Sequence, residues 1–232
     1  MSFNVYNKSS ENMSEISDAS VDLIYTSPPY NIGTKYKDNS DRMDVPKYQL
    51  LLKSIFAECF RILKPQGRLI IEVADSIVSG DKYIQLAGFI QSYCVELGMK
   101  VEERHINFAL TKDGQELPEH NWNKNYVATT DAHSNCHQII VLSKSNNTSF
   151  VGHGKVMYFD YVSTPEHPCP TPKGLCDFIL ENYYDDGMTV AEPFMGTAAI
   201  GKEVLKRKGN FIGYELDKTI FNATNEALGE IY

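Results

Sequence analysis

Residues 21–33 read VDLIYTSPPYNIG, a short apolar run that ends in Ser-Pro-Pro-Tyr. Two prolines cannot continue a strand, because each lacks a backbone donor and holds φ near about −65°. In an open parallel sheet, ligands bind beyond the carboxyl ends of the strands. We therefore expect the corner at residues 26–30 to carry the chemistry of this protein.

The groups at this corner suit a planar amine. Ser27 offers a side-chain acceptor, the Pro28 carbonyl has no competing partner in a strand ladder, and Tyr30 supplies a flat ring. Together they could hold a planar group that bears an exocyclic NH₂. A plain turn is the alternative, and Pro-Pro alone would favour it, but the complete strand-Ser-Pro-Pro-Tyr-Asn string is far more specific.

Apolar strands and amphipathic helices alternate along the rest of the chain. Strands are predicted at residues 21–27, 68–74, 100–110, 137–144, 188–194 and 210–216, and helices at 48–63, 83–98, 174–184, 196–209 and from 218 onward. A turn, KPQG at 64–67, is expected before the second strand. The alternation predicts one α/β domain over residues 1–232, with a Rossmann-like, mainly parallel sheet and helices on both faces.

A second corner lies in VAEPFMGTAAIG, residues 190–201, where a predicted strand is followed by a glycine and a helix. Glycine lets a ligand approach the backbone, and a helix N-terminus attracts an anion such as a carboxylate. About 20 residues further on, Glu215 ends the next predicted strand, where an acidic residue commonly accepts hydrogen bonds from ribose hydroxyls. This spacing indicates an adenosine-containing cofactor.

The composition limits the classes of protein that need to be considered. No run of roughly 18 apolar residues predicts a membrane span, and residues 1–15 lack the pattern of a signal peptide. Five cysteines at irregular spacing are typical of reduced thiols, which favours a cytoplasmic protein. The net charge of −8 counts against nonspecific phosphate attraction but is compatible with a local basic patch or a basic partner subunit.

Five segments, in this order, resemble the motifs of amino-group DNA methyltransferases: TSPPYNIG, RILKPQGRLIIEVAD, HPCPTP, AEPFMGTAAIG and FIGYELD. Such enzymes use S-adenosylmethionine to methylate the N6 of adenine or the N4 of cytosine. The resemblance therefore implies S-adenosylmethionine as cofactor and DNA as partner, with the target base flipped out of the duplex and stacked on Tyr30. The catalytic motif precedes the cofactor motif, which is the circularly permuted order of the β class.

The resemblance also implies roles for individual residues. Its catalytic motif falls on Ser27, Pro28, Pro29 and Tyr30. Its cofactor-binding positions fall on Thr26, Asp75, His167, Pro168, Glu192, Phe194, Gly196, Thr197, Ala198 and Glu215. The chain departs from the family pattern at 197–199, where Thr-Ala-Ala replaces Ser-Gly-Thr, and at Glu72, where relatives often have Asn.

Two further patterns suggest rival chemistry. Pro168-Cys169 resembles the nucleophile of enzymes that methylate cytosine C5, which need an activated thiolate, but it lies far in sequence from the corner. We interpret Cys169 as structural. His133, Cys136 and His137 lack a second ligand pair at zinc spacing, so no metal site is predicted.

Recognition of the target has to come from loops or from a partner. Residues 111–136 and 145–165 are candidate recognition loops, since the chain shows no large separate recognition domain. Within them Asn121, Trp122, Asn123 and Lys124 could contact bases or phosphates, although a solvated loop that packs its Trp on the domain is an equal alternative. A homodimer could also combine two such surfaces.

Three functions stay open at this point. Ser27 at the start of the catalytic motif favours cytosine N4, whereas adenine N6 enzymes more often have Asp or Asn there. A methyltransferase acting on RNA or protein is disfavoured by the motif order. A non-catalytic subunit that binds DNA or a partner would fit the altered cofactor loop, but the intact corner and Glu215 favour an enzyme.

Overall fold

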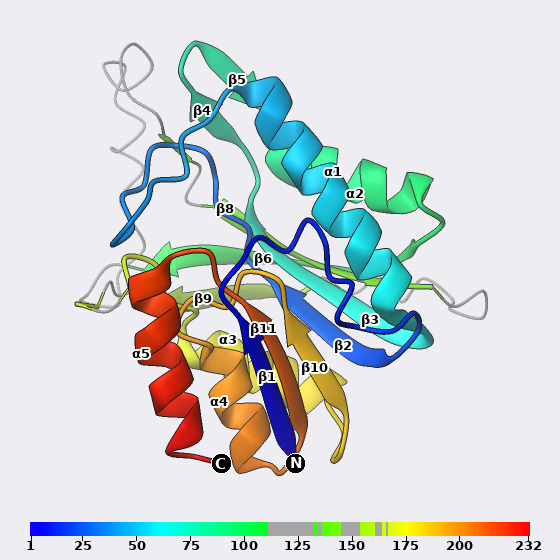
Figure 1. Ribbon diagram of the computed structural model, residues 1–232. Coiled ribbons are helices and arrows are strands. Elements are labelled where there is room, and N and C mark those ends of the chain that lie inside the picture. Colours follow the sequence, from blue (N-terminus) through cyan, green and yellow to red (C-terminus); the bar gives the residue numbers. More distant parts are fainter. Residues whose placement is uncertain (111–131, 134–135, 145–153, 161–163, 166) are drawn as a thin grey trace.

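The computed structural model describes residues 1–110, 132–133, 136–144, 154–160, 164–165 and 167–232 (Figure 1). In this part of the chain, one large sheet runs through the molecule in the order β1-β11-β10-β2-β3-β8-β6-β9. Its strands are β1 (Ser2–Tyr6), β2 (Val21–Thr26), β3 (Leu63–Ala74), β6 (Lys100–Leu110), β8 (Cys136–Ser143), β9 (Val156–Asp160), β10 (Thr189–Glu192) and β11 (Asn210–Tyr214). All neighbours are parallel except β3–β8 and β6–β8. The predicted mainly parallel α/β sheet is confirmed.

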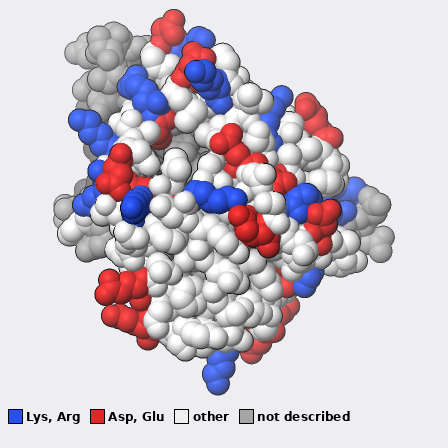
Figure 2. All heavy atoms as spheres, in the orientation of Figure 1, with Lys and Arg blue, Asp and Glu red and all other residues white. Residues whose placement is uncertain are grey.

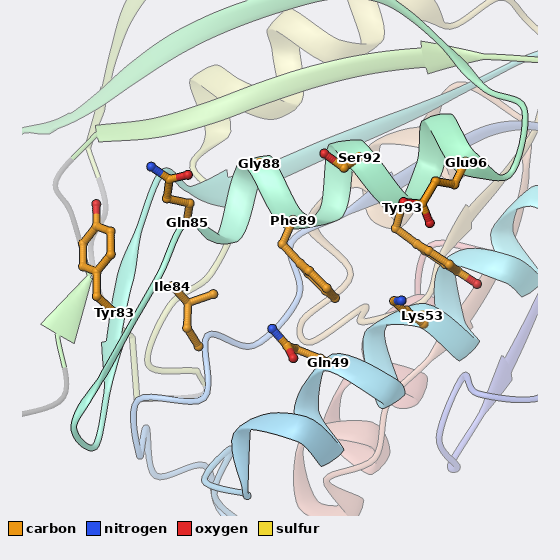
Figure 3. Close-up of a pocket in the computed structure, with 10 residues that line it drawn as sticks. All are labelled: Gln49, Lys53, Tyr83, Ile84, Gln85, Gly88, Phe89, Ser92, Tyr93 and Glu96. Carbon is orange, nitrogen blue, oxygen red and sulfur yellow. The ribbon is translucent and has the colours of Figure 1, made fainter.

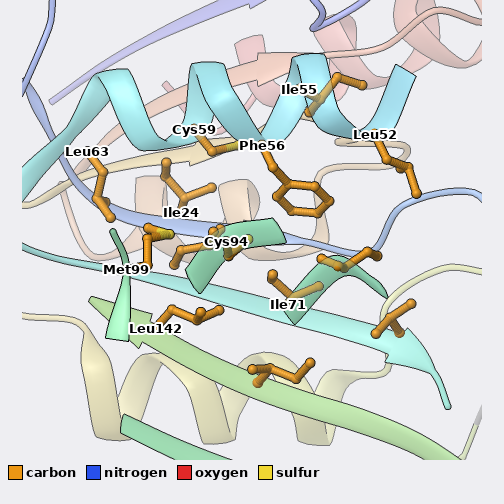
Figure 4. Close-up of a cluster of buried hydrophobic side chains, with 14 of the residues drawn as sticks. Ile24, Leu52, Ile55, Phe56, Cys59, Leu63, Ile71, Cys94, Met99 and Leu142 are labelled. Carbon is orange, nitrogen blue, oxygen red and sulfur yellow. The ribbon is translucent and has the colours of Figure 1, made fainter. Parts of the chain in front are cut away.

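Helices cover both faces of this sheet, each with its own apolar core. On one face lie α1 (Val45–Ile62) and α2 (Leu86–Glu96), and on the other α3 (Lys173–Tyr183), α4 (Ala199–Lys206) and α5 (Lys218–Gly229) (Figure 1). Figure 4 shows how α1 builds the first core: Leu52, Ile55, Phe56 and Cys59 recur at helical spacing and point at the sheet. Pro46 lies in the first turn of α1, where the missing N–H costs nothing.

Four local predictions differ from the structure. The segment 64–67 is part of the long strand β3 rather than a turn, and a register shift against β2 absorbs it. The helix predicted from residue 83 begins at Leu86, because Lys82–Ile84 form strand β5 against β4 (Ile77–Ser79). The edge strands β1 and β9 were not predicted. β9 occupies part of the recognition loop proposed at 145–165, and β7 (Ala132–His133), with the first residue of β8, lies within the one proposed at 111–136.

The direction of the strands decides where the sequence motifs meet. Because β11, β10, β2 and β3 are parallel, Glu215, the glycine loop, the Ser-Pro-Pro-Tyr corner and Asp75 all follow carboxyl ends at the same edge of the sheet. The antiparallel strand β8 brings its amino end, with His137, to that edge. Within the described ranges, no helix is long and apolar enough to cross a bilayer.

Candidate active site at the carboxyl edge of the sheet

Hydrogen bonds from neighbouring segments hold the Ser-Pro-Pro-Tyr corner in place. The Tyr48 hydroxyl of α1 donates a 2.7 Å hydrogen bond to the carbonyl of Pro29. Asn31, which adopts a left-handed conformation with φ +59°, binds Met43 through both its side-chain oxygen and its side-chain nitrogen. Asn is among the few residues that tolerate this conformation. The corner therefore has little freedom to move relative to the sheet.

Ser27 is linked to a buried acid on the next strand. Its hydroxyl donates a 2.7 Å hydrogen bond to Oε2 of Glu72 on β3, and Oε1 of Glu72 contacts Nδ1 of His137 on β8. Glu72 and His137 are 3% and 4% exposed, so the pair lies out of bulk water. Because its own hydrogen is donated to Glu72, the Ser27 oxygen can act as an acceptor toward another donor.

The ring of Tyr30 lies edge-to-face with the His137 imidazole, with centroids 5.8 Å apart. Burial, and then the negative charge of Glu72, raise the pKa of Tyr30 well above its usual value, while a hydrogen bond with Ser27 opposes the rise. Tyr30 therefore stays a neutral phenol beside Ser27. The sequence prediction identified Ser27 and Tyr30 and noted Glu72 only as a departure, and it missed His137 as a neighbour of the corner.

The glycine loop and Glu215 are in direct contact. The Gly196 N–H donates to Oε2 of Glu215 at 3.0 Å, and the Asp217 N–H donates to Oε1 at 2.7 Å. An ionised carboxylate has about four acceptor positions, so room remains for hydroxyl donors. Gly196 has φ +49°, and a Cβ at this position would meet Nε2 of His167 at 3.0 Å. The loop thus brings the backbone of Gly196, the carboxylate of Glu215 and the imidazole of His167 together.

Glu192 is buried at the end of β10 and contacts the first turn of α4. Its Oε2 accepts a 3.3 Å hydrogen bond from the Gly201 N–H in the first turn of α4. Burial raises the pKa of Glu192 to about 8, against the opposing effect of that backbone hydrogen bond. Ala198, at the N-cap of α4, is left-handed with φ +50°, a conformation more usual for glycine.

The remaining predicted cofactor residues surround the same edge. Thr26 is 1% exposed, and its hydroxyl makes no hydrogen bond with any described residue. A buried hydroxyl without a partner is costly, so it suits a site that a polar ligand completes. Asp75 accepts a 3.2 Å hydrogen bond from Gln138. Phe194 packs partly buried against the first core, and Thr197 and Pro168 are half-buried.

Two patterns in the sequence suggested other chemistry, a cysteine nucleophile at Cys169 and a metal site. Desolvation, followed by the charges of Glu72 and Asp41, raises the pKa of Cys169, which opposes a thiolate nucleophile. Among the described residues, no group of three or more His, Cys, Asp or Glu side chains is arranged to hold a metal ion. Asn121, Trp122, Asn123 and Lys124 lie outside the described residues, as does most of the 111–136 segment.

A groove elsewhere on the surface is unrelated to this edge. It has a volume of about 490 Å³ and lies between α1 and α2, lined by Lys53, Phe89 and Tyr93 among others (Figure 3). It contains neither the Ser-Pro-Pro-Tyr corner nor the glycine loop. On the face drawn in Figure 2, basic and acidic side chains are interspersed at the upper left, where the loop 31–44 lies in Figure 1. That loop carries the exposed residues Lys35, Lys37 and Arg42.

Comparison with known proteins agrees with this geometry. The model of the N6/N4 DNA methylase family matches residues 21–161 and 118–226, which together span most of the chain. The chain belongs to the N6/N4 DNA methylase family. It is therefore a DNA methyltransferase that depends on S-adenosylmethionine, and solved structures of the same fold include complexes with that cofactor.

Individual relatives of this methylase differ in the base that their names give. It is 24% identical to the type II methyltransferase M.HpaI of Haemophilus parainfluenzae, over 93% of this chain and 70% of that protein. It is also 24% identical to the DNA adenine methyltransferase YhdJ of Escherichia coli, over 88% of this chain and 75% of that protein. The PvuII DNA methyltransferase, described as cytosine-N4-specific, has the same fold with a TM-score of 0.73, 16% identity and coverage of 100% and 92% of the two chains.

Proposed function

We propose that this methylase transfers a methyl group from S-adenosylmethionine to the exocyclic N4 of a cytosine flipped out of DNA. The observation that carries the proposal is the 2.7 Å hydrogen bond that the Ser27 hydroxyl donates to Glu72. It leaves the Ser27 oxygen as an acceptor next to the Pro28 carbonyl, so that two acceptors face one amine. The first position of the catalytic motif, Ser rather than Asp or Asn, favours cytosine.

The residues of the chain then perform the following steps. Ser27 and the Pro28 carbonyl accept the two amine hydrogens, which draws the nitrogen lone pair out of conjugation with the ring and aims it at the methyl group. S-adenosylmethionine supplies an electrophilic methyl group on a positively charged sulfur. When the amine receives the methyl group that the cofactor would supply, one amine proton would pass to the Ser27 oxygen while the Ser27 hydroxyl hydrogen would pass to Glu72. Tyr30 holds the extruded base by stacking.

The residues assigned to the cofactor support this reading. Glu215 offers carboxylate acceptors to ribose hydroxyls, and Thr26 offers a buried hydroxyl. Because the corner precedes the glycine loop in the chain, we infer the permuted motif order of the β class. The exposed Lys35, Lys37 and Arg42 offer individual cations for DNA phosphates, on a loop that also carries Asp38 and Asp44 and in a chain with a net charge of −8. A homodimer or a basic partner subunit would add to these contacts.

Adenine N6 methylation by the same steps is the second candidate, because the match to the adenine enzyme YhdJ spans most of both chains. The decisive experiment is methyl transfer from labelled cofactor to duplex DNA, followed by nucleoside analysis. We expect label in N4-methylcytosine. Label in N6-methyladenine would replace the base assignment, and label in 5-methylcytosine would overturn the mechanism. If the wild-type protein does not bind S-adenosylmethionine at all, a non-catalytic subunit is the correct interpretation.

The role of the corner has its own test. The Ser27→Ala variant removes one of the two acceptors, so we expect turnover to fall roughly 100-fold while the affinity for S-adenosylmethionine stays within about threefold of wild type. Isothermal titration with the cofactor and single-turnover methylation measure the two quantities separately. Unchanged turnover in this variant would contradict the proposed part played by Ser27.

A further inference from the structure

The loop that follows the corner crosses the active edge and docks on the other half of the molecule. Its tip is tied to the N-terminus of α5 by reciprocal hydrogen bonds. The Asp38 N–H donates to Oδ2 of Asp217 at 2.6 Å, and the Thr219 N–H donates to Oδ2 of Asp38 at 2.8 Å. The first turn of α5 therefore has two of its backbone N–H groups bound by carboxylates, Thr219 by Asp38 and Ile220 by Asp217, although Asp38 lies far away in sequence.

The same loop places an aromatic ring beside the cofactor residues. Tyr36 contacts His167, with ring centroids 5.6 Å apart and planes at 52°. His167 is the ring that lies against Gly196, and the N–H of Cys169 donates to its Nδ1 at 3.1 Å, which fixes its orientation. Burial raises the pKa of Tyr36 above its usual value, and the charge of Glu215 is among the neighbouring charges that add to the rise. Tyr36 therefore stays neutral close to Glu215.

The base of the loop is equally well fixed. Oδ1 of Asp41 accepts a 2.7 Å hydrogen bond from the Gly33 N–H, and the Asp41 N–H donates to the Thr34 carbonyl at 3.2 Å. At the tip, the Tyr36 N–H donates to the Asn39 carbonyl at 2.9 Å and makes a tight turn. In Figure 1 this loop reaches from the end of β2 to the top of α5. It is an ordered strap between the two halves of the site.

We propose that residues 33–41 form a clamp on S-adenosylmethionine, in which Tyr36 contacts the cofactor and Asp38 is a positioning residue that holds Tyr36 in place. Glu215 connects the two parts, since it accepts a hydrogen bond from the N–H of Asp217, whose side chain holds Asp38. An aromatic face next to a carboxylate suits a nucleoside with a cationic sulfur. The inference rests on the proposed position of the cofactor between Gly196 and Glu215.

Titration with S-adenosylmethionine tests the clamp without relying on activity. We expect Asp38→Ala and Tyr36→Ala each to raise the dissociation constant for S-adenosylmethionine about tenfold. Tyr36→Ala removes the ring, and Asp38→Ala removes the side chain that holds it in place. Asp38→Asn keeps a side-chain oxygen that can accept from Thr219 and should recover most of the affinity. Asp44→Ala is the matched control, since Asp44 ends the same loop without making a side-chain cap to α1.

Hydrogen exchange supplies the second readout. In the wild type, S-adenosylmethionine should slow amide exchange in residues 33–41 as well as in the glycine loop 192–198, and Asp38→Ala should abolish the first effect and keep the second. Equal cofactor affinity in the wild type, Asp38→Ala and Tyr36→Ala would overturn the clamp. Protection of 192–198 without any protection of 33–41 would do the same. Absence of cofactor binding by the wild type would instead refute the proposed function.

Discussion

Glu72 lies between the Ser27 hydroxyl and the His137 imidazole, and in the proposed mechanism it receives the serine proton. Replacing Glu72 by Gln removes the charge that attracts the serine proton, so we expect single-turnover methylation to slow roughly 10- to 100-fold with little change in cofactor affinity. Glu102→Gln is the control, since Glu102 is also buried but pairs with Arg68 on the outer part of the sheet. Equal losses of turnover in both variants would indicate a general structural effect.

Glu192 gives the stability of the protein a dependence on pH. Its pKa is raised to about 8 by burial, so the folded state holds a proton that the unfolded state releases above about pH 4.5. The folded state binds more protons between these values, and this group therefore makes the free energy of unfolding fall as pH rises from about 4.5 to about 8.

The Glu192→Gln variant isolates that contribution. The difference in free energy of unfolding between this variant and the wild type should shift by roughly a few kcal/mol in favour of the variant as the pH rises from about 5 to about 8.5. The reason is that Gln has no proton to lose, whereas Glu192 in the wild type does. Urea unfolding of both proteins across this range measures the difference. The Glu226→Gln variant, altered at an exposed position of α5, should follow the wild type in parallel. A Glu192→Gln curve that also stays parallel to the wild type would contradict the raised pKa.

At the scale of elements, helix α4 packs so closely on β11 that a glycine is required. A Cβ on Gly201 would lie 2.5 to 2.7 Å from the ring of Phe211. Gly201→Ala should therefore lower the free energy of unfolding by roughly 1 to 3 kcal/mol, although alanine is the better helix former. Gly229→Ala in α5 is the matched control, because nothing lies within 4 Å of its added Cβ, and it should be neutral or slightly stabilising. Urea unfolding measures both, and similar effects of the two variants would refute the packing argument.

The elements also separate what the sequence could predict from what it could not. Buried strands such as β2 and β8 are nearly continuous apolar runs, so their existence followed from local pattern. β1 and β9 are five-residue edge strands, each paired on one side within the described sheet, and their short sequences carry little signal apart from that partner. The predicted helix start at residue 83 was wrong, because Tyr83 and Ile84 belong to a strand that pairs with β4.

The active edge shows the same division. Ser27, Tyr30, Gly196 and Glu215 stand in compact motifs that local sequence reveals, and the structure gathers them at one edge of the sheet. The contact between Glu72 and His137 depends on the antiparallel register of β3 and β8, in which Ala74 lies opposite His137 and Ile139 opposite Glu72. A one-residue slip of β8 against β3 would turn His137 to the face opposite Glu72, and no local pattern fixes that register.

At the scale of the whole molecule, we expect the fold to be independent of the order of the motifs along the chain. Both ends of this chain lie together in Figure 1, and the rings of Phe3 and Tyr232 are 5.6 Å apart. The turn at Asp186 and Gly187, between α3 and β10, is exposed. A permutant that begins at Gly187, joins Tyr232 to Met1 by a Gly/Ser linker of about six residues and ends at Asp186 would place the glycine loop before the corner.

We expect this permutant to unfold cooperatively in urea and to bind S-adenosylmethionine within about threefold of the parent affinity, because every strand keeps its neighbours in the sheet. A control permutant opened between Gly201 and Lys202 interrupts α4 and should fail both tests, since its new ends disrupt the helix that Glu192 caps. If the first permutant fails as well while the linker is long enough to join the ends, the chain order is itself needed to build the site. The two outcomes therefore decide whether the site depends on motif order or on strand adjacency alone.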